Sequence, residues 1–199
     1  MELLTGSNRF VRSPFQPGIR WSPGFVAIAI VIVIASSTLA FGQAGTLDPT
    51  YGSGGLATVF SQASGNLLTA AAIQADDKVV MVGTNPGDVL VRLNTNGTLD
   101  ASFGTNGVVS ENFNVLGPPM AVVIQPNQQI LVLASGFLGT AIGRFNSDGS
   151  MDTTFGTGGF ASTRLISNGA SAIIPMALQS NGSILIGGNG LIARFTSSG

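Results

Sequence analysis

Two ionisable residue types recur at regular spacing and are the first candidates for chemistry. The aspartates are Asp48, Asp100 and Asp152, and the arginines are Arg92, Arg144 and Arg194. Repeated carboxylates could bind calcium, but that ion takes about six to eight oxygen ligands, usually from several carboxylates close together. Each aspartate stands alone in its stretch of sequence. We therefore favour a turn in which the carboxylate accepts backbone N–H groups.

The arginines and aspartates also predict a contact with each other. Arg92 precedes Asp100 by eight residues, and Arg144 precedes Asp152 by eight. An apolar residue stands two positions before each arginine, on the same face of an extended strand. These residues are Leu90, Ile142 and Ile192. A half-buried guanidinium needs partners, so we predict that Arg92 pairs with Asp100 and Arg144 with Asp152, directly or through the turn backbone. The alternative is exposed arginines of little energetic consequence. Arg194 has no aspartate eight residues further on.

The composition excludes several classes of active site. The chain has 199 residues, no histidine and no cysteine, and only 9% of its residues are charged. Without these side chains a Ser-His-Asp triad, a thiolate nucleophile and a His- or Cys-ligated metal are excluded. The net charge of −1 offers no basic field for nucleic acid. The acids outside the repeated positions are scattered; after residue 44 they are Asp76, Asp77, Asp88, Glu111 and Asp148. We therefore predict no catalytic, cofactor-binding or metal-binding residues, and no enzymatic activity.

The first 44 residues differ from the rest. Residues 25–40 are uncharged and mostly apolar, arginines precede them, and small residues follow. This is the pattern of a secretory signal peptide, cut after Ala44 or, as a second choice, after Ala40. An uncleaved membrane anchor is the alternative, but the apolar run is shorter than the roughly 20 residues of a spanning helix. We expect a secreted or cell-envelope protein that touches the membrane only through this segment, if it stays uncleaved.

The remaining sequence is three copies of one unit. Each copy opens with the pattern G-x-L/M-D-x-x-Y/F-G-x-x-G, at Gly45, Gly97 and Gly149, a period of 52 residues. The copies are residues 45–96, 97–148 and 149–199.

Four short β-rich runs per copy predict an all-β fold. In the first copy these runs are 56–60, 69–74, 78–83 and 89–94, and their counterparts follow in both later copies. Four strands per unit of this length are typical of a β-propeller blade. The competing β-helix has shorter coils, and a helical solenoid does not fit the pattern. We predict β-propeller-type four-stranded blades, three consecutive ones forming an open partial propeller, after an N-terminal signal helix.

The other repeated residues have structural interpretations. The aromatics Tyr51, Phe103 and Phe155 are expected to wedge between neighbouring blades, although a stacking platform for sugar is possible. The glycines Gly52, Gly104 and Gly156 suit positive φ or close backbone approach.

These motifs resemble the delta-60 repeat, a β-propeller repeat of bacterial secreted and surface proteins. The resemblance rests on the opening motif, the I-Q-x-x-x-K-I/V strand and the closing A-R-F/L-N-x-x-G, and covers about 155 residues. Met151 and Tyr51 stand where the pattern has Leu and Phe, and Asp77 and Gln128 where the third copy has glycine. The resemblance implies a propeller in a bacterial protein, without implying an activity.

Three blades are fewer than the about four to eight of a closed propeller. Because no capping unit appears, we favour a fragment of a longer protein over two chains that supply six blades. The expected function is a non-catalytic secreted or cell-surface module with a structural or interaction role and a protein or glycan partner. The alternatives are a fragment of a propeller-type carbohydrate-active enzyme, which needs two suitably spaced carboxylates, and a calcium-linked glycan-binding module.

Overall fold

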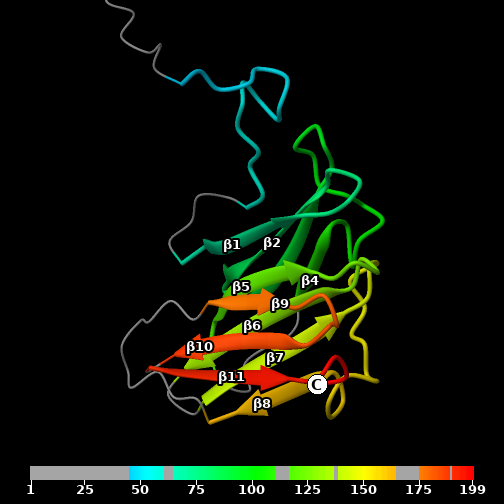
Figure 1. Cartoon of the computed structure of the whole chain (residues 1–199). Helices are drawn as coiled ribbons and strands as arrows, with labels where there is room; N and C mark the ends of the chain where they lie inside the picture. The colour runs from blue at the N-terminus through cyan, green and yellow to red at the C-terminus, as the bar shows by residue number, and fades with distance from the viewer. Residues whose placement is uncertain (1–44, 61–64, 111–116, 137–138, 165–174, 189) are drawn as a thin grey trace, which may run out of the picture. The chain divides into compact units, whose positions relative to one another are not determined.

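The computed structural model describes residues 45–60, 65–110, 117–136, 139–164, 175–188 and 190–199. The predicted signal helix and its cleavage after Ala44 lie outside these ranges, as does Glu111. The described residues form strands, turns and loops (Figure 1), and none of their segments is a helix long and apolar enough to cross a membrane.

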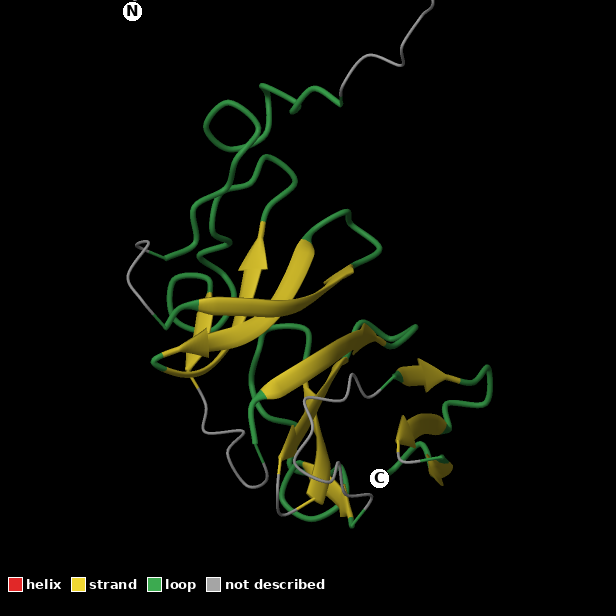
Figure 2. Cartoon of the chain, turned by 90° about the vertical axis from the view of Figure 1, so that its left-hand side faces the viewer, coloured by secondary structure: helices red, strands yellow, loops and turns green. Residues whose placement is uncertain are grey.

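Eleven strands make up the described part of the chain. They are β1 (Leu67–Ile73), β2 (Val79–Asn85), β3 (Gly87–Leu93), β4 (Val108–Ser110), β5 (Pro119–Ile124), β6 (Ile130–Gly136), β7 (Gly139–Phe145), β8 (Phe160–Thr163), β9 (Met176–Leu178), β10 (Ile184–Gly188) and β11 (Leu191–Phe195). They form three antiparallel sheets in the orders β1-β2-β3-β4, β5-β6-β7-β8 and β9-β10-β11. The expected all-β fold is confirmed (Figure 2).

The sheets are out of phase with the 52-residue copies. Strand β4 comes from the second copy but pairs with β3 of the first, through Leu90 opposite Val109. Strand β8 of the third copy pairs with β7 of the second in the same way, through Ile142 opposite Ala161. The prediction that each copy forms a blade by itself therefore needs correction. A blade takes its fourth strand from the copy that follows, which links consecutive copies through backbone hydrogen bonds.

The same offset explains the one predicted strand that is missing. Residues 56–60 of the first copy correspond to β4 and β8, yet they form only isolated bridges at Leu56. A short segment of this kind becomes a strand by pairing with the sheet before it, and none precedes it within the described residues. Its side chains Ala57, Val59 and Phe60 instead pack on the outer face of the first sheet.

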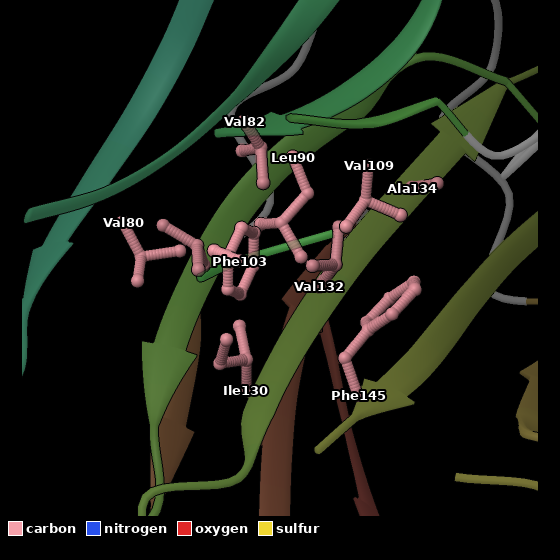
Figure 3. Close-up of a cluster of buried hydrophobic side chains, with 10 residues drawn as sticks. Val80, Val82, Leu90, Phe103, Val109, Ile130, Val132, Ala134 and Phe145 are labelled. Atoms are coloured by element: carbon pink, nitrogen blue, oxygen red, sulfur yellow. The ribbon is translucent and has the colours of Figure 1, made fainter. Parts of the chain in front are cut away.

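The sheets pack face to face and enclose two cores. One core lies between the first and second sheets and includes Val80, Leu90, Ile130 and Val132 (Figure 3). The other, centred on Phe155, lies between the second and third sheets, which overlap in Figure 1. The middle sheet is covered on both faces, so β6 reads as a continuous buried run rather than an alternating one. Two sheets of four strands and one of three, stacked in this way, are β-propeller blades, as the repeat predicted.

Candidate functional site

The first joint between blades is built around Arg92 on β3. Its Nε donates to Oδ2 of Asp100 at 2.7 Å, and both side chains are only 8% exposed. Its Nη1 donates to the backbone carbonyl of Ser147, and its Nη2 to Oγ of Ser102 at 3.2 Å. Lys78 adds a second cation, with Nζ 3.1 Å from Oδ2 of Asp100. One guanidinium therefore joins a blade to the opening motif of the next copy and to the turn before the third.

The second joint repeats this arrangement one blade further along. Nε of Arg144 donates to Oδ2 of Asp152 at 2.7 Å, and Nη1 donates to the carbonyl of Ser197 at 2.8 Å. The place of Lys78 is taken by Gln129, whose Nε2 donates to Oδ2 of Asp152 at 2.7 Å. Both predicted pairs, Arg92 with Asp100 and Arg144 with Asp152, are confirmed. The second joint carries one positive charge fewer than the first.

The aspartates of the three motifs also hold the predicted turns. In each copy Oδ1 accepts the backbone N–H and the hydroxyl of the residue two positions further on, at distances between 2.6 and 3.0 Å. Those donors are Thr50, Ser102 and Thr154. Within the described residues, no three side chains of the His, Cys, Asp or Glu type come together as metal ligands would. The Oδ1 hydrogen bonds confirm the turn interpretation of Asp48, Asp100 and Asp152.

The two phenylalanines of the motif are wedges between blades. Phe103 and Phe155 are fully buried, and Phe103 lies between Val80 and Leu90 of the first sheet and Val132 of the second (Figure 3). The guanidinium carbon of Arg92 stands 4.5 Å from the ring centroid of Phe103, and the second joint has the same contact at 4.6 Å. The ring of Phe103 thus contacts apolar side chains of both blades on its sides and the buried guanidinium of Arg92 over its face. Tyr51, at the corresponding place in the first copy, is only half-buried.

The motif glycines have the predicted backbone conformation. The φ angles of Gly52, Gly104 and Gly156 are 58°, 52° and 53°. A Cβ at Gly104 would lie 2.5 Å from the carbonyl oxygen of Val108. Positive φ and close approach of the next strand both require glycine here, so the motif turns the chain sharply into β4 or β8.

Hydrogen bonds keep the joint carboxylates ionised. The side-chain hydrogen bond from Ser102 lowers the pKa of Asp100 well below its usual range, helped by Lys78, the Ser102 amide and the charge of Arg92, while burial opposes them. The hydroxyl of Thr154 likewise lowers the pKa of Asp152. The turn carboxylates Asp48 and Asp148 also have lowered pKa values, through Thr50 and Ser150.

These shifts predict a protein that is destabilised by acid. A carboxyl whose folded pKa lies below its unfolded value of about 3.9 stabilises the fold above that value and loses this contribution as pH falls through the folded pKa. We expect the urea midpoint to be flat near neutral pH and to fall steeply below about pH 4. In the variant Asp100→Asn, Asp152→Asn the protein is less stable at neutral pH, but its acid dependence is shallower. An equal slope in both proteins would contradict the assignment.

Some polar groups were not assigned a role from the sequence. A groove of about 610 Å³ lies beside the first joint and is lined by Gln74, Asp76, Asn127, Gln128, Ser147 and Asp148, with Arg92 and Ser102. The side-chain Oε1 atoms of Gln74, Gln125 and Gln179 are buried without a hydrogen-bond partner among the described residues. The sequence did contain a sign of their importance, because a glutamine ends the second β-rich run in every copy.

The acids outside the repeat do not form a common centre in the described residues. Asp76 pairs with Lys78 at 3.4 Å and is largely exposed, and Asp148 holds the turn at Ser150. Asp88 differs, because burial raises its pKa and its Oδ2 has no hydrogen-bond partner among the described residues.

These features define the class of the protein: a β-propeller repeat protein whose blades are joined by a repeated Arg–Asp contact. Residues 74–103 and 125–155 match the sequence model of the family described as a domain of unknown function (DUF5122) beta-propeller. Each matched segment runs from a buried glutamine to a buried phenylalanine and contains one Arg–Asp pair. The match therefore covers both Arg–Asp pairs. No curated protein matches the chain.

Two solved structures show weak similarity. A catalytically inactive variant of virginiamycin B lyase from Staphylococcus aureus with quinupristin is 11% identical, with a TM-score of 0.39 over 68% of this chain and 43% of that one. A protein of unknown function from Bacteroides caccae is 12% identical, with a TM-score of 0.31 over 70% of this chain and 67% of that one. This chain thus spans less than half of the lyase structure, and neither similarity adds to the inference of function.

Proposed function

We propose that this protein is a non-catalytic β-propeller repeat module of the delta-60 type, secreted or held at the bacterial cell surface. Its role is to present a propeller surface to a glycan or protein partner. The observation that carries the proposal is that four of the six repeated ionisable residues are committed to joints between blades, as the pairs Arg92–Asp100 and Arg144–Asp152. The apolar segment before residue 45 supports export.

The polar side-chain atoms of Arg92 and Asp100 all take part in hydrogen bonds within the first joint. All three guanidinium nitrogens of Arg92 donate hydrogen bonds. Oδ2 of Asp100 accepts from Nε of Arg92 and contacts Lys78, whereas Oδ1 accepts from Ser102. A general acid or base must exchange a proton near the working pH. The lowered pKa of Asp100 and the permanent charge of Arg92 suit a structural contact instead.

The groove beside the first joint is the surface best suited to a partner. Asp76, Asn127 and Gln128 line its rim with carboxylate and amide groups; Asp76 and Asn127 are exposed, and Gln128 is half-buried. Such groups accept and donate hydrogen bonds to hydroxyls, so a hydroxyl-rich glycan fits this groove better than an apolar ligand.

Calorimetry with the full chain and a panel of bacterial surface polysaccharides tests the proposal, with product release followed in parallel. We expect a polysaccharide to bind without being cleaved. Asn127→Ala removes one hydrogen-bonding side chain from the groove and should weaken binding by about three- to tenfold. Asn181→Ala is the matched control, because Asn181 holds the corresponding turn of the third copy through Ser183 and lies outside the groove.

Two outcomes would contradict this function. Release of oligosaccharide or unsaturated product by the purified chain would overturn the non-catalytic assignment. Equal binding by the Asn127 and Asn181 variants would remove the groove from the interaction.

A further inference from the structure

Two grooves beside the first joint share part of their lining. The groove of the proposed function has a volume of about 610 Å³ and reaches the turns that follow β1 and β5, at Asp76 and Asn127. A second groove of about 600 Å³ lies along β4 and is lined by Val108–Ser110. Ser102 and Asp148 belong to the lining of both grooves. The two grooves therefore meet at these two residues.

The grooves follow one another across the width of the first blade. Strands β1 and β4 are the two edges of its sheet. The first groove includes residues that follow β1, and the second includes the whole of β4. A ligand that fills both grooves thus crosses from one edge of the blade to the other. Each groove alone has the volume of an ordinary small-molecule site, about 300–1,000 Å³, so the two in line suit a chain of several linked units.

The second groove contributes polar groups that are available to a ligand. Thr105 and Ser110 are exposed, and their hydroxyl groups form no hydrogen bond with other described residues. Where the grooves meet, Asp148 uses Oδ1 to hold its turn through Ser150, whereas its Oδ2 accepts no hydrogen bond within the described part of the chain. Hydroxyl groups both donate and accept hydrogen bonds and a carboxylate accepts them, so these groups can pair with the hydroxyls of a sugar.

The charges of the grooves disfavour an acidic glycan. The charged residues of the lining are Asp76, Asp148 and Arg92. Arg92 is already paired with Asp100, and Asp76 with Lys78. Asp148 forms no ion pair with the residues that the structure describes. An acidic sugar would therefore meet an unpaired carboxylate where the grooves join, whereas an uncharged sugar would not be repelled.

We propose that the two grooves form one cleft for an extended, uncharged polysaccharide strand of several sugar units, with Asp148 at its centre. Asn127 binds the strand in the first groove and Ser110 binds it in the second. The inference rests on the proposed function and specifies the kind of glycan that the module takes, which is a run of linked units rather than a single sugar.

The dependence of affinity on ligand length tests the cleft. The probes are oligosaccharides of different lengths, prepared by partial hydrolysis of the polysaccharide that binds in the calorimetry panel. We expect the affinity of the full chain to rise at least about tenfold from the shortest oligosaccharide to the one that fills both grooves, and then to level off, because further units make no new contacts. Oligosaccharides of equal length that carry carboxylates should bind at least about tenfold more weakly.

Variants at the two ends of the cleft test which groove holds which part of the strand. Ser110→Ala and Asn127→Ala should each weaken binding of the longest oligosaccharide by about three- to tenfold. Only one of the two should affect the shortest oligosaccharide, because it fills a single groove. Ser162→Ala is the matched control, since Ser162 has the same position in β8 as Ser110 has in β4 and lies outside both grooves. The variants at Ser110 and Ser162 should keep the urea midpoint of the wild type, because both side chains are exposed.

The possible failures are distinguishable. Affinity that does not depend on length, or equal binding of the longest oligosaccharide by the Ser110 and Ser162 variants, would overturn the two-groove cleft. Weaker binding by the Asn127 variant would then still support the proposed function. Tight binding of the carboxylate-bearing oligosaccharides would overturn the preference for an uncharged strand. If no polysaccharide of the panel binds the full chain, then the glycan-binding function and the cleft are both wrong.

Discussion

Replacing Phe103 with alanine is expected to destabilise the protein by about 3–5 kcal/mol, the usual cost of removing a fully buried aromatic side chain. Phe103 belongs to no strand, yet it contacts both blades of the first joint and carries the guanidinium of Arg92 over its ring. Its removal leaves a cavity between two sheets that are held by their own hydrogen bonds and cannot easily collapse into it. Urea unfolding of the full chain, followed by circular dichroism, measures the loss.

The repeat supplies a matched control for this prediction. Tyr51 occupies the same motif position but is only half-buried, so Tyr51→Ala should cost clearly less than Phe103→Ala. Phe103→Leu should fall between wild type and Phe103→Ala, because it fills part of the space. Equal losses from the Tyr51 and Phe103 variants would contradict the wedge role.

The strands and the joints were predictable because both repeat. Three copies in register show which residues matter without any other sequence, and the eight-residue spacing between Arg92 and Asp100 was enough to predict their contact. A strand of alternating or continuous apolar residues, followed by a polar turn, is a local signal. These features depend on neighbours in sequence, so the sequence contains them almost completely.

The offset between copies and blades could not be predicted in the same way. Val108–Ser110 is as β-rich as any other run, and its sequence does not reveal whether it pairs with the strand before it or after it. Pairing partners are a tertiary property, decided here by the sharp glycine turn at Gly104 that returns the chain to β3. For the same reason the sequence did not show that residues 56–60 form isolated bridges instead of a strand.

The groove and the buried glutamines were missed for a different reason. Gln74 and Gln125 are polar residues at the ends of strands, where solvent exposure is the usual outcome. Only packing shows that both are buried. Residue type and spacing thus identified contacts between opposite charges, but they gave no measure of burial for a neutral polar side chain.

Replacing Asp100 with asparagine is expected to cost about 3–5 kcal/mol, because it leaves the buried cation of Arg92 without its counter-charge. Asparagine retains an oxygen that can accept the hydrogen bonds of Ser102, so the turn survives and the loss reports mainly on the charged contacts. Lys78 also loses its partner, whereas the second joint has the neutral Gln129 at that place. Asp152→Asn should therefore cost less than Asp100→Asn. Asp48→Asn should change the free energy of unfolding least, because Asp48 is exposed.

Replacing both partners separates the strength of the pair from the penalty of breaking it. Removing one member of a buried ion pair leaves a desolvated charge, whereas apolar replacements of both can be close to neutral. The variant Arg92→Met, Asp100→Leu should therefore be more stable than Asp100→Asn, although it lacks both charges and also loses the turn acceptor of Asp100. If the double variant is the less stable of the two, then the pair is itself a net source of stability. That result would mean that the ion pair itself stabilises the contact between the blades. The opposite result would mean that apolar burial stabilises the contact and that the charges mainly determine which surfaces fit together.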